Sequence, residues 1–164
     1  MTQPVRITAH LDSLSVGLTE TPMMLDGPLS WVWWQLQGSG RIAPGQAPGD
    51  AALPLARWVE AGTWGWCVSR AHPQVEAHTA IELRRKPATD AMARYTTDKR
   101  FHPGLGPHSA RDVTVAAAWV PRVWWDADTT DVDALHALLV DVTHLGAHAA
   151  VGYGRVSGWS IEAG

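Results

Sequence analysis

The stretch Gly146 to Arg155, Gly-Ala-His-Ala-Ala-Val-Gly-Tyr-Gly-Arg, joins a predicted helix to a predicted strand near the end of the sequence. Gly146, Gly152 and Gly154 permit backbone angles and close approaches that a Cβ atom would forbid. Successive amide groups in such a loop can form a concavity for an anion. Tyr153 adds a flat ring, and the guanidinium group of Arg155 matches phosphate geometry. The loop therefore suits the backbone of a polyanion, and the alternative is a turn whose glycines serve geometry alone.

The elements on either side of this loop are well marked in the sequence. Thr130-Asp-Val-Asp133 has the form of a capping box and predicts a helix start. The helix would end at Gly146 as its C-cap. After the loop, Gly154–Glu162 predicts the last strand, with Val156, Gly158 and Ser160 on one face. The apolar stripe that predicts the helix consists of Val132, Leu135, Leu138, Leu139, Val142 and Leu145.

The N-terminal region predicts a strand followed by a helix. Apolar and polar residues alternate over Pro4–Val16, which is the period of a half-buried strand. A turn follows, and Asp26–Gln37 then has helical periodicity, with Asp26 as the expected N-cap and Pro28 in the first turn.

The middle of the chain predicts short strands within loops. Gly38–Pro54 is rich in glycine and proline and predicts a loop, and Leu55–Ala61 predicts a short helix. The predicted strands are Trp64–Ala71, Thr79–Arg85, Val113–Val120 and, after Pro121, Arg122–Asp126. The order strand–helix–strand–(strand)–strand–helix–strand, with the strand in parentheses optional, is a split βαβ, ferredoxin-like (RRM-like) pattern. We therefore predict one α+β domain over 1–164, with an antiparallel sheet and two main helices.

The segment 84–111 differs from the rest of the chain in its charge. It holds seven of the 13 basic residues against two acidic ones, a net +5, whereas the whole chain carries −3, so the remainder carries −8. Such asymmetry suggests a nucleic-acid or other polyanionic partner, and the alternative is a solvated loop. Tyr95 and Phe101 lie among the charges, which suits base stacking beside phosphate contact. The basic residues are Arg84, Arg85, Lys86, Arg94, Lys99, Arg100 and Arg111.

The amino-acid composition indicates the cellular compartment in which we expect the protein. Cys67 is the single cysteine of the 164 residues, so no internal disulfide is possible and a reducing cytosol is expected. The sequence shows no signal peptide and no apolar run long enough for a membrane span, so we expect a cytoplasmic protein. Ten tryptophans stand against one phenylalanine. We expect most of them in the core or at subunit interfaces, with Trp34 and Trp125 off the core.

Three parts of the sequence carry a family resemblance: Leu25-Asp26-Gly27 at the helix entry, the basic segment 84–111, and Thr143-His-Leu-Gly146 through Gly152-Tyr-Gly-Arg155. With these parts in this order, the chain resembles the RAMP (repeat-associated mysterious protein) superfamily of CRISPR–Cas systems. Within it, the chain looks most like the crRNA 5′-end-binding subunit of type IV effector complexes. The resemblance covers most of the chain.

The resemblance implies a non-catalytic subunit that caps the 5′ handle of the crRNA. The glycine-rich loop, including Gly146, His148 and Gly152–Arg155, would lie against the crRNA backbone. The segment 84–111 would be a thumb that wedges between handle and spacer. The implied partners are crRNA, backbone RAMP subunits and a large subunit, with no cofactor and no membrane. The family often has lysines and arginines before Gly-Tyr-Gly, where this chain has Ala-His-Ala-Ala-Val at 147–151.

Two other functions stay open at this point. RAMP endoribonucleases that process repeats often use a histidine, and His10, His102 and His108 are the candidates here. No Ser-His-Asp set, paired carboxylates or metal-ligand spacing is legible, so we predict no catalytic residue and no metal site. The third possibility is a ferredoxin-like domain with no role in nucleic-acid binding.

Overall fold

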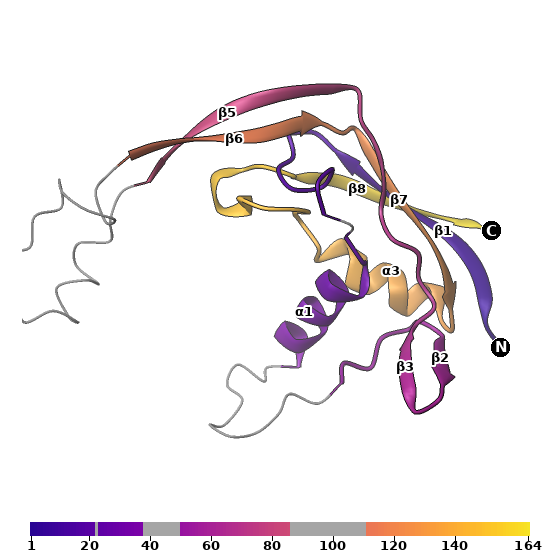
Figure 1. The fold of residues 1–164 in the computed structure, drawn as a ribbon. Helices are drawn as coiled ribbons and strands as arrows, with labels where there is room; N and C mark the ends of the chain where they lie inside the picture. Colours follow the sequence, from indigo (N-terminus) through magenta and orange to yellow (C-terminus); the bar gives the residue numbers. More distant parts are fainter. Residues whose placement is uncertain (22, 38–49, 86–110) are drawn as a thin grey trace, which may run out of the picture.

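The computed structural model describes residues 1–21, 23–37, 50–85 and 111–164 (Figure 1). The strands β4, β7, β1 and β8 form one antiparallel sheet in that order. This is the strand order of the ferredoxin-like fold, and it confirms the predicted α+β class. The elements are β1 (Gln3–Leu11), α1 (Asp26–Leu36), β2 (Arg57–Glu60), β3 (Thr63–Trp66), β4 (His72–Gln74), β5 (Ala77–Arg85), β6 (Arg111–Trp119), β7 (Arg122–Thr129), α3 (Val132–Val140), the 3-10 turn η1 (Ala149–Val151) and β8 (Val156–Ala163).

One face of the four-stranded sheet packs against both helices (Figure 1). Strand β1 alternates as its sequence predicts, because Val5, Ile7, Ala9 and Leu11 are all buried. Strand β7 follows the same rule, and its inward residues include Trp125, which is fully buried. The indole Nε1 of Trp125 donates to the Met23 carbonyl oxygen at 3.1 Å.

The expectation that Trp125 lies off the core is therefore wrong, because the alternation of β7 points it toward the helices. Its neighbour Trp124 takes the opposite face and is half-exposed. Trp34 on α1 is partly buried and packs against the core. The adjacent tryptophans 124 and 125 thus lie on opposite faces of a strand. Trp33 and Trp34 both pack against the core from helix α1.

Strands β5 and β6 form a two-stranded arm that runs out beyond the four-stranded sheet (Figure 1). Their pairing extends without a break from Ala77 opposite Trp119 to Arg85 opposite Arg111. The arm connects β4 to β7, so it is an extension of the central hairpin of the fold. Both predicted strands are confirmed here, although each begins two residues earlier than expected. Of the basic segment 84–111, residues 86–110 lie outside the described residues.

The predicted helix over Leu55–Ala61 is wrong. Residues 57–60 form strand β2, which pairs with β3 in a hairpin. Ala61 and Gly62 make its turn with φ of +48° and +81°. Four residues of strand cannot be told from one helical turn by periodicity alone. The three-residue strand β4 at the sheet edge was not expected either.

The last helix is shorter than predicted, and Gly146 is not its C-cap. Helix α3 begins after Asp131, whose side chain accepts a hydrogen bond from the amide of Ala134 at 2.9 Å. It ends at Val140, with Asp141 as C-cap. The apolar stripe continues past this end because Val142 and Leu145 are buried as irregular chain.

Other ends of elements also differ from expectation. Helix α1 begins at Asp26, but the N-cap residue is Leu25 and no side chain caps the helix. Strand β1 stops at Leu11, not at Val16. A bulge in the pairing of β1 with β8 turns Val156 toward the core, away from the face of Gly158 and Ser160. No helix of the described ranges is long and apolar enough to cross a membrane.

Candidate nucleic-acid interface

The glycine-rich loop, residues 146–155, is bonded to the chain that follows β1. The amide of Ala147 donates to the carbonyl of Val16, and the amide of Gly154 donates to the carbonyl of Leu14, each at 2.8 Å. The amide of Leu145 in turn donates to the carbonyl of Gly154 at 2.8 Å. These bonds fix the loop at both ends and against a segment far away in sequence.

The three glycines of the loop have different surroundings. All have positive φ: +85° at Gly146, +92° at Gly152 and +68° at Gly154. A Cβ atom at Gly146 would collide with the carbonyl oxygen of Val16, and one at Gly154 with that of Leu145. At Gly152 nothing lies within 4 Å of the position a Cβ atom would take. Close packing therefore requires two of the glycines, whereas Gly152 borders open space.

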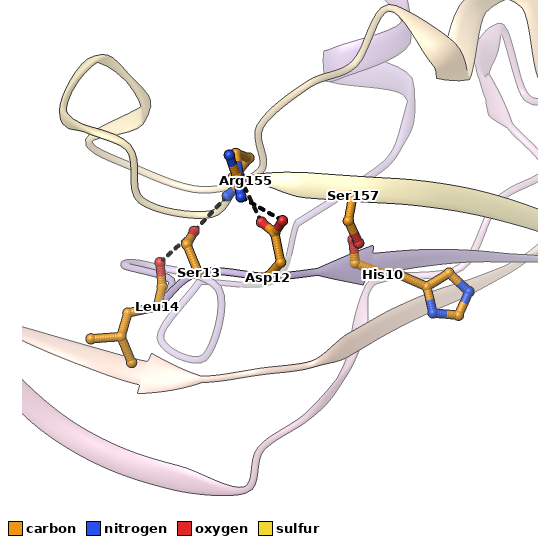
Figure 2. Close-up of polar contacts among 6 residues, drawn as sticks. All are labelled: His10, Asp12, Ser13, Leu14, Arg155 and Ser157. Carbon is orange, nitrogen blue, oxygen red and sulfur yellow. Dashed lines mark hydrogen bonds and ion pairs between the residues drawn. The ribbon is translucent and has the colours of Figure 1, made fainter.

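Arg155 has an acidic partner within the protein (Figure 2). Its Nε donates to Oδ1 of Asp12 at 2.8 Å, and its Nη2 donates to Oδ2 at 2.6 Å. Its backbone amide donates to the hydroxyl of Ser13 at 2.8 Å. The hydrogen bond from Arg155 is the main reason why the pKa of Asp12 lies below its usual value, and the same bond raises the pKa of Arg155. A phosphate would compete with Asp12 for this guanidinium group.

The loop amides are also largely used within the protein. Those of Val151 and Tyr153 donate to the carbonyl of His148, and that of Gly152 donates to Ala149. With the amides of residues 154 and 155 bonded as above, five successive N–H groups have protein acceptors. The predicted anion concavity therefore does not involve these five amides. Among the groups that the loop presents outward are the half-exposed ring of Tyr153, the exposed side chains of His148 and Val151, and the open side of Gly152.

The arm carries its basic residues at the end farthest from the sheet. The register places Arg85 directly opposite Arg111, and Arg84 opposite Asp112. The closest nitrogen–oxygen distance between Arg84 and Asp112 is 4.0 Å, with both side chains more than half exposed. Like charges opposite each other in a sheet destabilise the pairing. The other predicted contacts of this region lie outside the described residues: Lys86, Arg94, Tyr95, Lys99, Arg100 and Phe101.

Residues 14–16 connect the loop to the base of the arm. Ser15 and Ala118 of β6 exchange two backbone hydrogen bonds of 2.9 Å, and the Ser15 hydroxyl donates to the Ala118 carbonyl at 3.2 Å. Leu14 and Val16, on either side, accept the loop amides described above. The structure thus brings the two predicted RNA-binding elements to one segment, although they are separate in sequence.

The histidine candidates are only partly described. His10 lies on the sheet face away from the helices, with Nε2 3.4 Å from the Ser160 hydroxyl. His102 and His108 lie outside the described residues. Within the described ranges, no group of three or more His, Cys, Asp or Glu side chains could hold a metal ion.

Sequence reasoning missed two aromatic clusters. On β2–β3, the guanidinium of Arg57 lies 4.3 Å from the ring centroids of both Trp64 and Trp66. On the sheet, His72 of β4 stacks on Trp124 of β7, with centroids 5.6 Å apart and an interplanar angle of 18°. The outward position of Trp124 was readable from the alternation of its strand, but its histidine partner was not, because β4 was not predicted.

Comparison with known proteins finds likeness to chains of solved structures. No protein-family model matches the sequence, and no curated protein matches it either. A chain in the cryo-EM structure of the type III-B Cmr-beta complex bound to cognate target RNA is similar over 99% of this chain, with 9% identity and a TM-score of 0.49. This chain covers 61% of that chain.

Proposed function

We propose that this chain is a non-catalytic RNA-binding subunit of a type IV-like CRISPR ribonucleoprotein. It binds and caps the 5′ handle of the crRNA and docks the backbone subunits beside a large subunit. The basic arm acts as the thumb, and the outward side of the glycine-rich loop, around His148, Gly152 and Tyr153, lies against the RNA.

The observation that carries this proposal is the connection of arm and loop through residues 14–16. A strand of RNA that lies along the arm from its basic end to its base would reach the loop. At the far end of the arm, Arg85 and Arg111 face each other across the pairing. Two arginines at one register position favour an anionic ligand, and a phosphate is the anion that a guanidinium group fits best.

The test is the salt dependence of RNA binding. Replacing Arg84, Arg85 and Lys86 by alanine should weaken binding and flatten the slope of log affinity against log salt. Each phosphate of a single strand that the protein no longer neutralises changes this slope by about 0.7, so the expected change is about 2. The matched control is Arg57→Ala, which removes one cation from the β2–β3 hairpin. An unchanged slope in the triple variant would remove the arm from the RNA-binding surface.

The rival function is a metal-independent endoribonuclease of the same fold. Purified protein incubated with repeat RNA, with and without added divalent metal, should leave the RNA intact. Site-specific cleavage that is abolished in His10→Ala, His102→Ala or His108→Ala would make the chain an enzyme.

A further inference from the structure

Both helices lie on one face of the four-stranded sheet (Figure 1). The opposite face carries an aromatic pair, His72 and Trp124. Trp124 lies at the centre of this face, opposite Thr8 of β1 on one side and His72 of β4 on the other. The rings of His72 and Trp124 stack, and both side chains are half-exposed. The buried residues of β7 on either side of Trp124 are Val123 and Trp125, so the His72–Trp124 pair is not part of the hydrophobic core.

A groove of about 380 Å³ opens beside this pair, at the β4 edge of the sheet. Its polar side chains are Thr19, Glu20, Thr21 and Arg70, and its aromatic side chains are His72 and Trp124. The volume lies in the range of small-ligand sites, and the mixture of flat rings with hydroxyl, carboxylate and guanidinium groups suits one nucleotide.

Two arginines flank the aromatic pair without an acidic partner. In the described part of the chain, no carboxylate oxygen lies within 4.0 Å of the side-chain nitrogens of Arg70 or Arg122. Arg122 precedes Trp124 by two residues on β7, so both lie on the open face, with Gln74 opposite Arg122. Arg6 on the same face differs, because its guanidinium group is held by Asp126 at 2.8 Å. Free cations therefore occur beside the stacked rings, and a paired one lies farther along the sheet.

We propose that this surface is a second contact for single-stranded RNA, distinct from the arm and the glycine-rich loop. One base stacks on the Trp124–His72 pair, its nucleotide enters the groove at β4, and Arg70 and Arg122 bind the adjoining phosphates. Glu20 and the threonines provide acceptors and donors for the ribose and the base edge. This inference rests on the proposed function only in taking RNA as the ligand.

The test measures binding of a fluorescein-labelled oligouridylate to the full chain by anisotropy. Trp124→Ala should weaken binding by about 5- to 150-fold, the range for loss of one stacked base. Trp124→Phe should retain most of the affinity because a ring remains. Arg70→Ala and Arg122→Ala should each reduce the salt slope by about 0.7. Trp58→Ala is the matched control, since Trp58 is exposed on the β2–β3 hairpin, away from this surface.

The outcomes separate this inference from the proposed function. If the arm variants lose affinity while folded Trp124→Ala binds like the parent, the open-face contact is overturned and the function stands. If Trp124→Ala unfolds, the two arginine variants decide, and unchanged salt slopes in both overturn the inference. A parent that binds no RNA overturns both proposals. Displacement of the oligonucleotide by millimolar uridine monophosphate would make the groove a site for free nucleotides, and would overturn the assignment to an RNA strand.

Discussion

The glycine-rich loop and the β5–β6 arm hold most of the predicted RNA contacts, yet their polar groups are used in opposite ways. In the loop, five successive amides and the guanidinium group of Arg155 already have acceptors within the protein. At the end of the arm, the register places Arg85 opposite Arg111. The glycines of the loop therefore serve mainly to let the loop pack and hydrogen-bond against the rest of the protein. The described part of the arm has one long, exposed ion pair, between Arg84 and Asp112 at 4.0 Å, and its excess of basic residues favours an external ligand.

The largest expected effect separates two glycines of the loop. Gly154→Ala should destabilise the fold by about 2–5 kcal/mol, because the new methyl adds a collision with the Leu145 carbonyl to the strain of positive φ. Gly152→Ala adds only the strain, about 1 kcal/mol, since the space beside it is open. Chemical denaturation followed by circular dichroism measures both.

RNA binding by the two variants sharpens the same comparison. At a temperature where Gly152→Ala stays folded, it should bind RNA less tightly than the parent, because the altered backbone lies on the outward side of the loop. Equal destabilisation of both variants would contradict the packing difference. If Gly152→Ala binds RNA as tightly as the parent protein, the loop has a structural role only.

A smaller effect is expected from releasing Arg155. Asp12→Asn removes the carboxylate that holds the guanidinium group and also removes a negative charge beside the loop. Both changes favour a polyanion, so RNA affinity should rise and the salt slope should steepen by up to about 0.7. Asp50→Asn is the matched control, since it removes the carboxylate paired at 4.0 Å with Arg57 of the β2–β3 hairpin, outside the proposed RNA contacts. An affinity that does not change in Asp12→Asn would mean that Arg155 contacts no phosphate.

The smallest effect concerns the pKa of Asp12. The hydrogen bond from Arg155 lowers this pKa below the usual 3.8, so the pair stabilises the fold above that pH. The contribution is lost as the pH falls through the lowered value. In Arg155→Ala the pKa should move back up toward 3.8, as followed by NMR of the side-chain carboxyl carbon. The control variant Arg6→Ala should raise the pKa of Asp126 and leave the pKa of Asp12 unchanged. If the pKa of both carboxyl groups shifts, long-range charge and not the direct hydrogen bond sets the pKa of Asp12.

Much of the fold was predictable because its longer elements have clear periods. The alternation of β1 and the helical period of α1 follow directly from the sequence. The errors fall where tertiary contacts override local pattern. The segment after α3 keeps Val142 and Leu145 buried without helical backbone, and the bulge near Ser157 reverses the face of Val156. Short strands such as β2 and β4 have too few residues to show a period.

The candidate site was predictable only as a set of residue types. The sequence pointed to Arg155 and the glycines, but their partners Asp12, Leu14 and Val16 lie far away along the chain. Arg155 and Asp12, for example, are separated by 143 positions. Whether a guanidinium group is free or paired depends on such distant neighbours, and no local pattern encodes it.

The position of β1 in the sheet has a consequence for how the protein reaches its folded state. This strand is synthesised well before both of its partners, β7 and β8, as the 120-residue separation of Arg6 and Asp126 illustrates. During translation, β1 therefore leaves the ribosome with two unpaired edges and a row of apolar side chains. Domains dominated by such distant pairings fold slowly, and their folding intermediates expose apolar surface that is prone to aggregation. The nascent chain is thus expected to depend on chaperones until its last strand emerges.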